Sequence, residues 1–323
     1  MTTAVLKVYP VYSPHFWKAY FIQMRPYLLF VSGIAGLAGI AMANGESLPG
    51  WKIATAFIPL FLGYGFGQAL TDCFQTDTDK LSAPYRPLSR EIVSIKSVLF
   101  ISIAGLLFCA VVLFSLHIMS FILSCIAVVG LATYSYIKRN FWWGGPFYNA
   151  WIVSLLVLMG YFAGASAEIK SFPLSQMPFV FVSFFSYANF VLIGYLKDIK
   201  ADKATGYKTF PVVWGWQKTI FLGDIFALLT ILFFCLHGNF QVGELVAAGL
   251  ATVIIILGQV NGHRAKSQNE QEALIPILST VRSFILFHIA IVLHFQPAWW
   301  AYMIVYYLLF EIFLFKRPSR YQV

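Results

Sequence analysis

Charge is what this chain has least of. Asp, Glu, Lys and Arg together make up 11% of the 323 residues, whereas hydrophobic residues make up 59%. Soluble domains carry roughly 25% charged residues, so the composition excludes an ordinary soluble fold and indicates a membrane protein. The longest polar stretches, residues 71–94, 197–218 and 262–273, are too short to build a core of their own. We therefore predict a single integral-membrane domain over residues 1–323.

Cysteine and histidine are also scarce, and neither is arranged as a metal or redox motif. The four cysteines show no Cys-x-x-Cys spacing, so we expect them to pack as small apolar side chains. They are Cys73, Cys109, Cys125 and Cys235. His288 and His294 are six residues apart and lie on different faces of a helix. We expect buried, hydrogen-bonded histidines there and no metal site.

Ten apolar segments approach the length of about 20 residues that spans a bilayer as a helix. They cover residues 27–43, 51–70, 95–114, 118–137, 147–165, 178–196, 219–236, 242–260, 275–295 and 298–315. Pro276 and Arg282 interrupt the ninth segment, so nine spans with one re-entrant or interfacial stretch is the alternative. The first segment is too long and begins too late for a cleaved signal peptide. The predicted fold class is an all-α polytopic membrane protein.

Basic residues are distributed unevenly between the loops. If the N-terminus is cytoplasmic, every one of the 22 Lys and Arg residues except Lys52 and Lys170 lies on the cytoplasmic side. We interpret the net charge of +9 as this topology signal, and no basic run with interleaved aromatics predicts a nucleic-acid partner. Both loops described next then face the cytoplasm. With no targeting segment in the sequence, we expect a prokaryotic plasma membrane.

Aspartates form two short clusters, each after a long apolar segment and before a basic stretch. If the preceding helix continues, Asp72, Gln75 and Asp79 share one face at positions i, i+3 and i+7, whereas Asp77 points away. Asp198 and Asp202 share a face at i and i+4. Carboxylates are costly in so apolar a chain, which indicates a function.

The chemistry that suits two facing carboxylate clusters is a Mg²⁺ site. Mg²⁺ favours a few carboxylates together with phosphate oxygens over a cage built by protein alone. Basic side chains near the clusters could neutralise the remaining charge of a diphosphate. They are Arg86, Lys138, Arg139 and Lys197. The alternative for any single aspartate is a helix cap or a solvated loop residue.

The chain resembles the UbiA superfamily of intramembrane prenyltransferases over roughly residues 18–295. Asp198-Ile199-Lys200-Ala201-Asp202, followed by Gly206, Thr209, Pro211 and Gly215, is similar to the family's second motif, DxxxD with a Gly, Thr and Pro tail. The stretch 134–139, Tyr-Ser-Tyr-Ile-Lys-Arg, resembles the tyrosine-rich helix end whose basic pair meets the diphosphate.

The first motif, NDxxDxxxD before a Pro-Arg-Pro-like loop, is matched with changes. Counting back from Pro84 and Arg86 puts Thr71 at the Asn, keeps Asp72 and Asp79, and places Gln75 at the middle Asp. A register starting at Gln68 instead puts Thr76 at the last Asp. We prefer the first register because it preserves the spacing to the basic loop. Gln75 could still ligate through its carbonyl oxygen, and Asp77 could supply charge. A tenth helix is a further departure.

The resemblance implies a UbiA-like bundle around a central cavity that opens to membrane lipid. It implies Mg²⁺-dependent transfer of a prenyl group from an isoprenyl diphosphate to a small hydrophobic acceptor, which we expect to be aromatic. Metal ligands would be Asp72, Asp79, Asp198 and Asp202, with Gln75 and Asp77 as helpers, and the diphosphate ligands would be Arg86, Lys138, Arg139 and Lys197. A UbiA-type terpene cyclase, which uses no acceptor, is the main alternative. A transporter of an anionic lipid or metabolite is the third, although the acidic residues cluster at helix ends rather than at mid-membrane.

Overall fold

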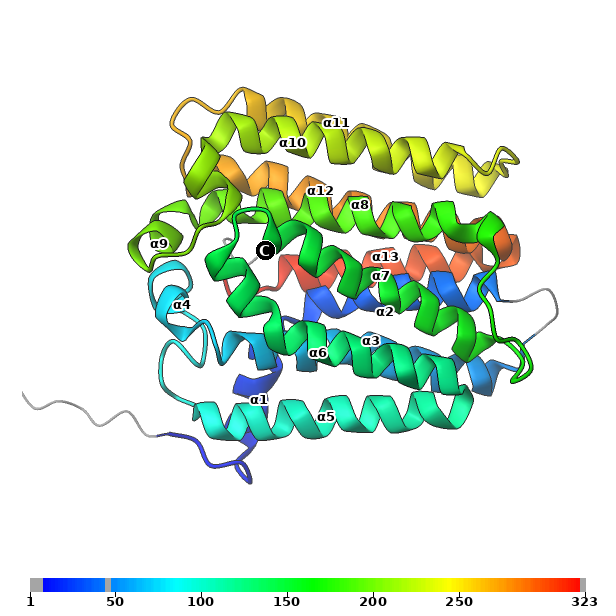
Figure 1. Ribbon diagram of the computed structural model, residues 1–323, viewed down its shortest axis with the longest axis horizontal. Coiled ribbons are helices and arrows are strands. Elements are labelled where there is room, and N and C mark those ends of the chain that lie inside the picture. Colours follow the sequence, from blue (N-terminus) through cyan, green and yellow to red (C-terminus); the bar gives the residue numbers. More distant parts are fainter. Residues whose placement is uncertain (1–7, 44–47, 320–323) are drawn as a thin grey trace, which may run out of the picture.

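A computed structural model describes residues 8–43 and 48–319, and within these ranges the chain is helical and contains no strand. The helices are α1 (Pro14–Gln23), α2 (Pro26–Met42), α3 (Gly50–Asp72), α4 (Thr76–Ser82), α5 (Ile95–Leu116), α6 (Ile118–Asn140), α7 (Gly144–Gly164), η1 (Leu174–Gln176), α8 (Met177–Gly194), η2 (Tyr195–Lys197), α9 (Ile199–Ala204), α10 (Phe210–Cys235), α11 (Val242–His263), α12 (Glu270–Phe295), η3 (Pro297–Trp299) and α13 (Trp300–Phe315). The long helices run alongside one another, as Figure 1 shows.

The predicted spans are confirmed. In the described part of the chain, nine helices are long and apolar enough to cross a membrane, and the bent pair α1 and α2 makes ten if it is counted as one span. The chain bends by 59° between α1 and α2, at Arg25 and Pro26. The protein is therefore an integral, multi-pass membrane protein.

The ninth predicted segment is one continuous helix and no re-entrant loop. α12 begins at Glu270 and carries Pro276 inside it without a break. Arg282 forms a two-pronged ion pair with Glu311 of α13, with N–O distances of 2.7 and 2.8 Å. Each charge is thus neutralised by the other.

The cysteines and the α12 histidines partly follow the prediction. Cys73 and Cys109 are buried, whereas Cys125 and Cys235 lie exposed on the outer surface, and all four are free thiols. His288 is fully buried and its Nδ1 lies 2.8 Å from the carbonyl oxygen of Phe284, as expected for a hydrogen-bonded core histidine.

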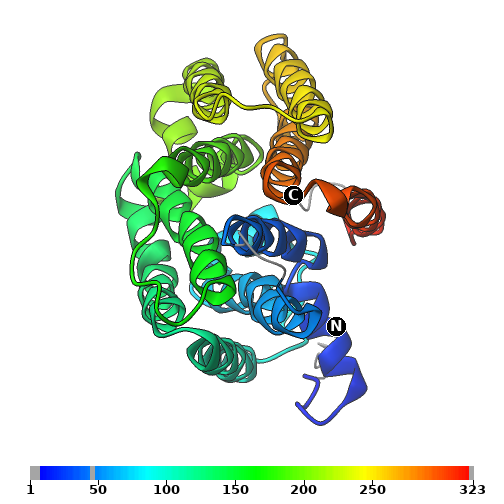
Figure 2. The ribbon, with the colours of Figure 1, turned by 90° about the vertical axis from the view of Figure 1, so that its right-hand side faces the viewer.

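α2, α8 and α12 are mostly buried, whereas α13 is mostly exposed. In the view along the helices, α13 lies at the outside of the bundle (Figure 2). The exposed residues of α5, α6, α11 and α13 are largely Phe, Leu, Ile and Val, which is the composition that a lipid environment requires. The core is therefore α2, α7, α8 and α12, with the other spans arranged around them.

α4 and α9 are two short helices that carry Asp77, Asp79 and Asp202 of the predicted site. They pack against each other at one end of the bundle, on the left in Figure 1. The turn between α10 and α11 lies at the other end. Lys52, one of the two basic residues predicted on the far side, donates hydrogen bonds to the carbonyl oxygens of Gly164 and Ala165 at the end of α7.

α2 and α7 meet through glycines. A Cβ atom on Gly39 would overlap the carbonyl oxygen of Val157, and one on Gly160 would overlap that of Gly36. The two backbones therefore touch directly, as in small-residue crossings of membrane helices, where close packing replaces the missing hydrophobic driving force.

This crossing predicts that Gly160→Ala destabilises the protein. The added methyl group must push the helices apart, at a cost of about 1–3 kcal/mol in the free energy of unfolding. Thermal unfolding in detergent measures the change. Gly249→Ala on α11, where a Cβ would meet nothing within 4 Å, is the matched control. Equal unfolding midpoints for the two variants would contradict the packing argument.

Candidate active site

The first aspartate cluster is divided between two helices. α3 ends at Asp72, and the chain turns before α4 begins with Gln75 as its N-cap residue. This turn directs Asp72, Gln75 and Asp79 toward one cavity, whereas Thr76 and Asp77 are not among its lining residues. In the register that we preferred from the spacing to the basic loop, the three acidic positions are Asp72, Gln75 and Asp79, and all three line this cavity.

The second cluster is shaped by the glycine that follows it. Gly206 has a φ of +78°, and the backbone N–H of Tyr207 donates to the carbonyl oxygen of Asp202 at 2.8 Å, while that of Gly206 donates to Lys203 at 3.4 Å. These two bonds form a Schellman motif, which ends α9 and favours glycine at the left-handed position. The reversed chain lets the Thr209 hydroxyl donate to the Asp202 carboxylate at 3.1 Å. The Gly and Thr of the motif thus orient an aspartate.

A polar cavity lies between the two clusters, with about 640 Å³ of space that is open to the outside. Seven of the ten predicted site residues line it: Asp72, Gln75, Asp79, Arg86, Lys138, Lys197 and Asp198. Its other polar or aromatic lining residues are Arg25, Tyr64, Gln68, Tyr134, Asn149, Tyr187, Phe190 and Tyr195.

Asp72 is the most heavily bonded carboxylate of the cavity. It is 2% exposed and accepts hydrogen bonds from the side-chain amides of Gln23 and Gln68 and from the guanidinium of Arg25, whose Nη2 lies 2.8 Å from Oδ1. Arg25 stands directly before Pro26 and has a φ of +54°, a conformation that costs a non-glycine residue about 1–2 kcal/mol. The bend between α1 and α2 thus places a strained arginine on the buried aspartate.

Arg86 joins the two carboxylates of the first cluster. Its Nη1 lies 2.6 Å from Oδ2 of Asp79 and 3.7 Å from Oδ2 of Asp72. All three side chains are buried, so the carboxylates face a guanidinium rather than water. The arginine of the Pro-Arg-Pro loop therefore lies where its charge neutralises the first cluster.

Two lysines lie beside the aspartates of the second cluster. Lys138 of α6 donates to Oε1 of Gln75 at 3.3 Å and lies 3.8 Å from Oδ1 of Asp202. Lys197 lies 3.0 Å from Oδ1 of Asp198. Lys138 also stacks over the ring of Tyr195 at 5.0 Å, a cation–π contact that stabilises a buried ammonium. Side chains from four segments thus converge on one cavity.

The carboxyls of Asp79 in the first cluster and Asp198 in the second differ in pKa. Burial raises the pKa of the Asp79 carboxyl above its usual range, although the Arg86 guanidinium opposes this effect. Burial acts in the same direction on Asp198, but the ammonium groups of Lys197 and Lys138 outweigh it and hold its pKa below the usual range. An added cation would therefore stabilise ionised Asp79 more than ionised Asp198.

Three predicted residues lie outside the cavity lining. Asp77 and Arg139 are half exposed and pair with each other at 3.3 Å. Asp202 is fully buried, and it accepts from Thr78 and Thr209 between α4 and α9. Asp202 therefore links α9 to α4 and pairs with Lys138. The structure does not bring Asp77 or Arg139 to the cavity.

The donor set fits Mg²⁺ as an ion shared with a phosphate. The lining carboxylates Asp72, Asp79 and Asp198 and the amide oxygen of Gln75 are hard oxygen donors, which Mg²⁺ prefers. Within residues 8–43 and 48–319, these carboxylates do not form a close group of three. A Mg²⁺ ion held by these separated carboxylates would therefore take further ligands from phosphate oxygens.

An apolar cavity continues from the polar one. It has about 770 Å³ of space between α3, α5, α6 and α7, and it shares five lining residues with the polar cavity, namely Tyr64, Gln68, Tyr134, Asn149 and Tyr187. Along α3 it extends from Pro59 to Thr71, about 18 Å at 1.5 Å per residue. A charged head and a long apolar tail would fit the two cavities together.

Sequence reasoning did not assign Arg25, Gln68, Asn149, Tyr64 or Tyr187 to this site. Arg25 gave a usable signal, because a basic residue before a proline marks a break at the start of the first span. The other four lie within apolar helices, and only the packing of α3, α7 and α8 shows that they face one cavity.

The chain is similar to known proteins along most of its length. The model of the UbiA prenyltransferase family matches residues 32–281. Digeranylgeranylglyceryl phosphate synthase from Thermococcus kodakarensis is 29% identical over 246 residues, which are 74% of this chain and 85% of that protein.

Solved structures share the fold. A UbiA homolog from Aeropyrum pernix K1 has a TM-score of 0.66 at 16% identity, covering 79% of this chain and 94% of that one. A UbiA homolog from Archaeoglobus fulgidus, bound to DMAPP and Mg²⁺, has a TM-score of 0.61 at 16% identity, covering 83% and 99%. The expected all-α, UbiA-like bundle is confirmed.

The buried Arg86 pair predicts a cation-dependent stability. Arg86→Met should lower the free energy of unfolding of the metal-free protein by about 3–5 kcal/mol, because it leaves Asp79 buried without its partner. Mg²⁺ should restore part of the loss, since a divalent ion can replace the missing charge. Thermal unfolding with EDTA or with Mg²⁺ measures both effects.

Lys80→Met is the control for this experiment, because Lys80 and its partner Glu91 are exposed. It should leave the unfolding midpoint unchanged in both buffers. An Arg86→Met protein as stable as the wild type in EDTA would contradict the assigned role of the pair.

Proposed function

The chain belongs to the UbiA prenyltransferase family and is a membrane-embedded prenyltransferase, and we propose that it moves a prenyl group from an isoprenyl diphosphate to a prenylated glyceryl phosphate, with Mg²⁺ as cofactor. The observation that carries the proposal is the joined pair of cavities, one polar and lined by carboxylates and cations, the other apolar and elongated. In this proposal the diphosphate binds in the polar cavity and the isoprenyl chain in the apolar one.

The diphosphate would meet four cationic side chains, Arg25, Arg86, Lys138 and Lys197. Against three lining carboxylates they leave a positive balance, which favours an anionic ligand. Bound Mg²⁺, held by Asp72, Asp79 and Asp198 with Gln75 and oriented indirectly by Asp202, would stabilise the charge that develops on the leaving diphosphate. The supporting residues thus act on the leaving group.

The reacting carbon would lie where the two cavities join. In the reaction, the bond between the allylic carbon and the diphosphate oxygen breaks, a hydroxyl oxygen of the acceptor bonds to that carbon, and the hydroxyl proton is released. The junction is lined by Tyr64, Tyr134 and Tyr187. Tyrosine rings can stabilise an allylic cation through cation–π contact. Gln68 and Asn149 are the other two residues that line both cavities.

The acceptor class is supported by the relative from Thermococcus kodakarensis, whose name describes a product with two geranylgeranyl groups on glyceryl phosphate. The sequence alone favoured an aromatic acceptor, and that expectation stays untested. A terpene cyclase would use the same cavities without an acceptor. The distribution of Lys and Arg supports a cytoplasmic location for the N-terminus and for the loops at the polar cavity.

Pyrophosphate release by the detergent-purified protein tests the proposal. The donors are geranyl, farnesyl and geranylgeranyl diphosphate, each with and without Mg²⁺. We expect Mg²⁺-dependent release only when geranylgeranylglyceryl phosphate is added. Release with a hydroxylated aromatic acid instead would identify an aromatic acceptor, and rapid release of a hydrocarbon or alcohol with no acceptor would identify a cyclase.

Substitution of the two aspartates of α4 should affect activity to very different extents. Asp79→Asn should lower turnover by about 100-fold or more, the scale seen when one electrostatic group is removed from an active site. Asp77→Asn, two residues away on the exposed face, should retain near wild-type turnover. Unfolding midpoints establish that both variants are folded. Equal activities would show that the cavity aspartates do not hold the metal.

The apolar cavity predicts control of donor length. Ala127→Phe adds a ring to the cavity wall, and the clash of about 1–3 kcal/mol should lower kcat/KM for geranylgeranyl diphosphate about 10-fold or more. Geranyl diphosphate should be affected less. Val129→Phe, on the exposed face of the same helix, is the control. An equal loss for both donors would contradict this tail site.

A further inference from the structure

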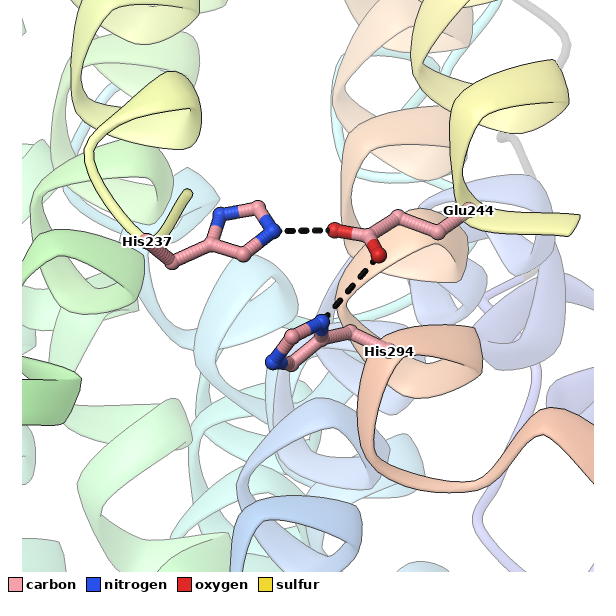
Figure 3. Close-up of side chains that lie close together, drawn as sticks. All are labelled: His237, Glu244 and His294. Carbon is pink, nitrogen blue, oxygen red and sulfur yellow. Dashed lines mark hydrogen bonds and ion pairs between the residues drawn. The ribbon is translucent and has the colours of Figure 1, made fainter. Parts of the chain in front are cut away.

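Three side chains converge at the end of the bundle opposite the polar cavity. His237 lies in the turn after α10, Glu244 in the first turn of α11, and His294 in the last turn of α12. Their nearest ligand-type atoms all lie within 4.8 Å of one another. Figure 3 shows both rings directed toward the carboxylate of Glu244. Among the residues that the structure describes, this is the group whose His, Asp, Glu and Cys atoms come close enough to share one metal ion.

Two atoms of this group face each other without a hydrogen bond. Nε2 of His237 lies 2.5 Å from Oε1 of Glu244. Both atoms are buried, and neither has a hydrogen-bond partner in the described part of the chain. Glu244 is fully buried and the His237 side chain is 6% exposed. A buried carboxylate oxygen and a ring nitrogen this close share either a proton or, after a small outward movement, a metal ion.

The other ring nitrogen of His237 defines which atom is available. Nδ1 lies 2.5 Å from the carbonyl oxygen of Phe234, which can only accept a hydrogen bond. Nδ1 therefore carries a proton, which leaves Nε2, the ring atom beside Glu244, as the one available to a metal ion. A ligating histidine that donates its second N–H to a backbone carbonyl is the usual arrangement in metal sites.

Glu244 and His294 complete the set. Oε2 of Glu244 lies 3.1 Å from Nδ1 of His294 and accepts the backbone N–H of Gln241 at 3.0 Å, so the carboxylate is fixed in a capping box. The rings of Phe179, Phe234 and Phe240 lie within contact distance of His237. These rings surround the His237 imidazole with apolar side chains.

We propose that His237, Glu244 and His294 form a binding site for a divalent transition-metal ion, with Zn²⁺ as the ion that fits best. Two imidazole nitrogens and one carboxylate oxygen suit Zn²⁺, whereas Mg²⁺ and Ca²⁺ prefer oxygen ligands alone. Three protein ligands leave a fourth position for water. The ion would join the α10–α11 turn to the end of α12, far from the diphosphate cavity and independent of the reaction there.

Metal content measures this site directly. The full-length protein in detergent is incubated with Zn²⁺ in excess Mg²⁺, dialysed against a weak chelator, and analysed for bound Zn²⁺. We expect one tightly held Zn²⁺ per chain in the wild type. His237→Gln, His294→Gln and Glu244→Gln should each weaken binding by about 10-fold to 100-fold or more, since even outer partners of a metal site contribute that much. The Gln at position 244 can still accept the Gln241 N–H, which preserves the helix cap.

His263→Gln is the matched control. His263 is also a histidine of α11 beside a carboxylate, with Nε2 2.7 Å from Oδ2 of Asp224, but it is exposed and lacks a third ligand in the described structure. This variant should bind Zn²⁺ as the wild type does. Zn²⁺ should also raise the unfolding midpoint of the wild type and of the control, and not that of His237→Gln.

Two results would overturn the proposal. The first is a wild-type protein that retains no Zn²⁺ and shows no visible absorption of tetrahedral Co²⁺ when Co²⁺ is supplied. The second is Zn²⁺ retention that is unchanged in His237→Gln and His294→Gln. Either result would leave the three side chains as a polar contact between helices.

Discussion

The constraint on which the rest of this structure depends is the cost of burying charge in a membrane protein. The carboxylates in and next to the polar cavity each lie beside a cation: Asp72 beside Arg25, Asp79 beside Arg86, Asp198 beside Lys197 and Asp202 beside Lys138. Without these partners the carboxylates would be too costly to keep charged. With them, the free protein is stable, and its charges are already in place for a ligand that carries both a metal ion and phosphate groups.

Local backbone features place these charges. The bend at Arg25 and Pro26, the turn between α3 and α4, and the left-handed Gly206 after α9 each reverse or redirect the chain at the same end of the bundle. Rigid spans then hold the redirected segments against one another. The long helices supply the apolar cavity, and the short segments supply its polar mouth, so head and tail recognition are divided between two kinds of structure.

At the opposite end of the bundle, a buried carboxylate has different partners. There Glu244 is buried between two histidines rather than beside an arginine or a lysine. Neutral histidines offer lone pairs, so they neutralise a carboxylate only through a shared proton or a metal ion. The two ends therefore stabilise their carboxylates in different ways. At one end the partners are arginine and lysine side chains, and at the other end they are histidine rings.

The sequence by itself determined the fold class, the ten apolar segments and most of the polar cavity. Hydrophobic length fixes membrane helices because the bilayer core requires internally bonded backbones. The spacing of Asp72, Gln75 and Asp79 predicted one shared helix face, but the helix ends at Asp72 and a turn brings the three residues to the same cavity. Only the tertiary structure decided that Asp77 and Arg139 lie outside and that Asp202 joins two helices. It alone brought Arg25 and Asn149 into the cavity and His237 to His294. These contacts link helices far apart in the chain, and their partners are set by packing, which no local pattern records.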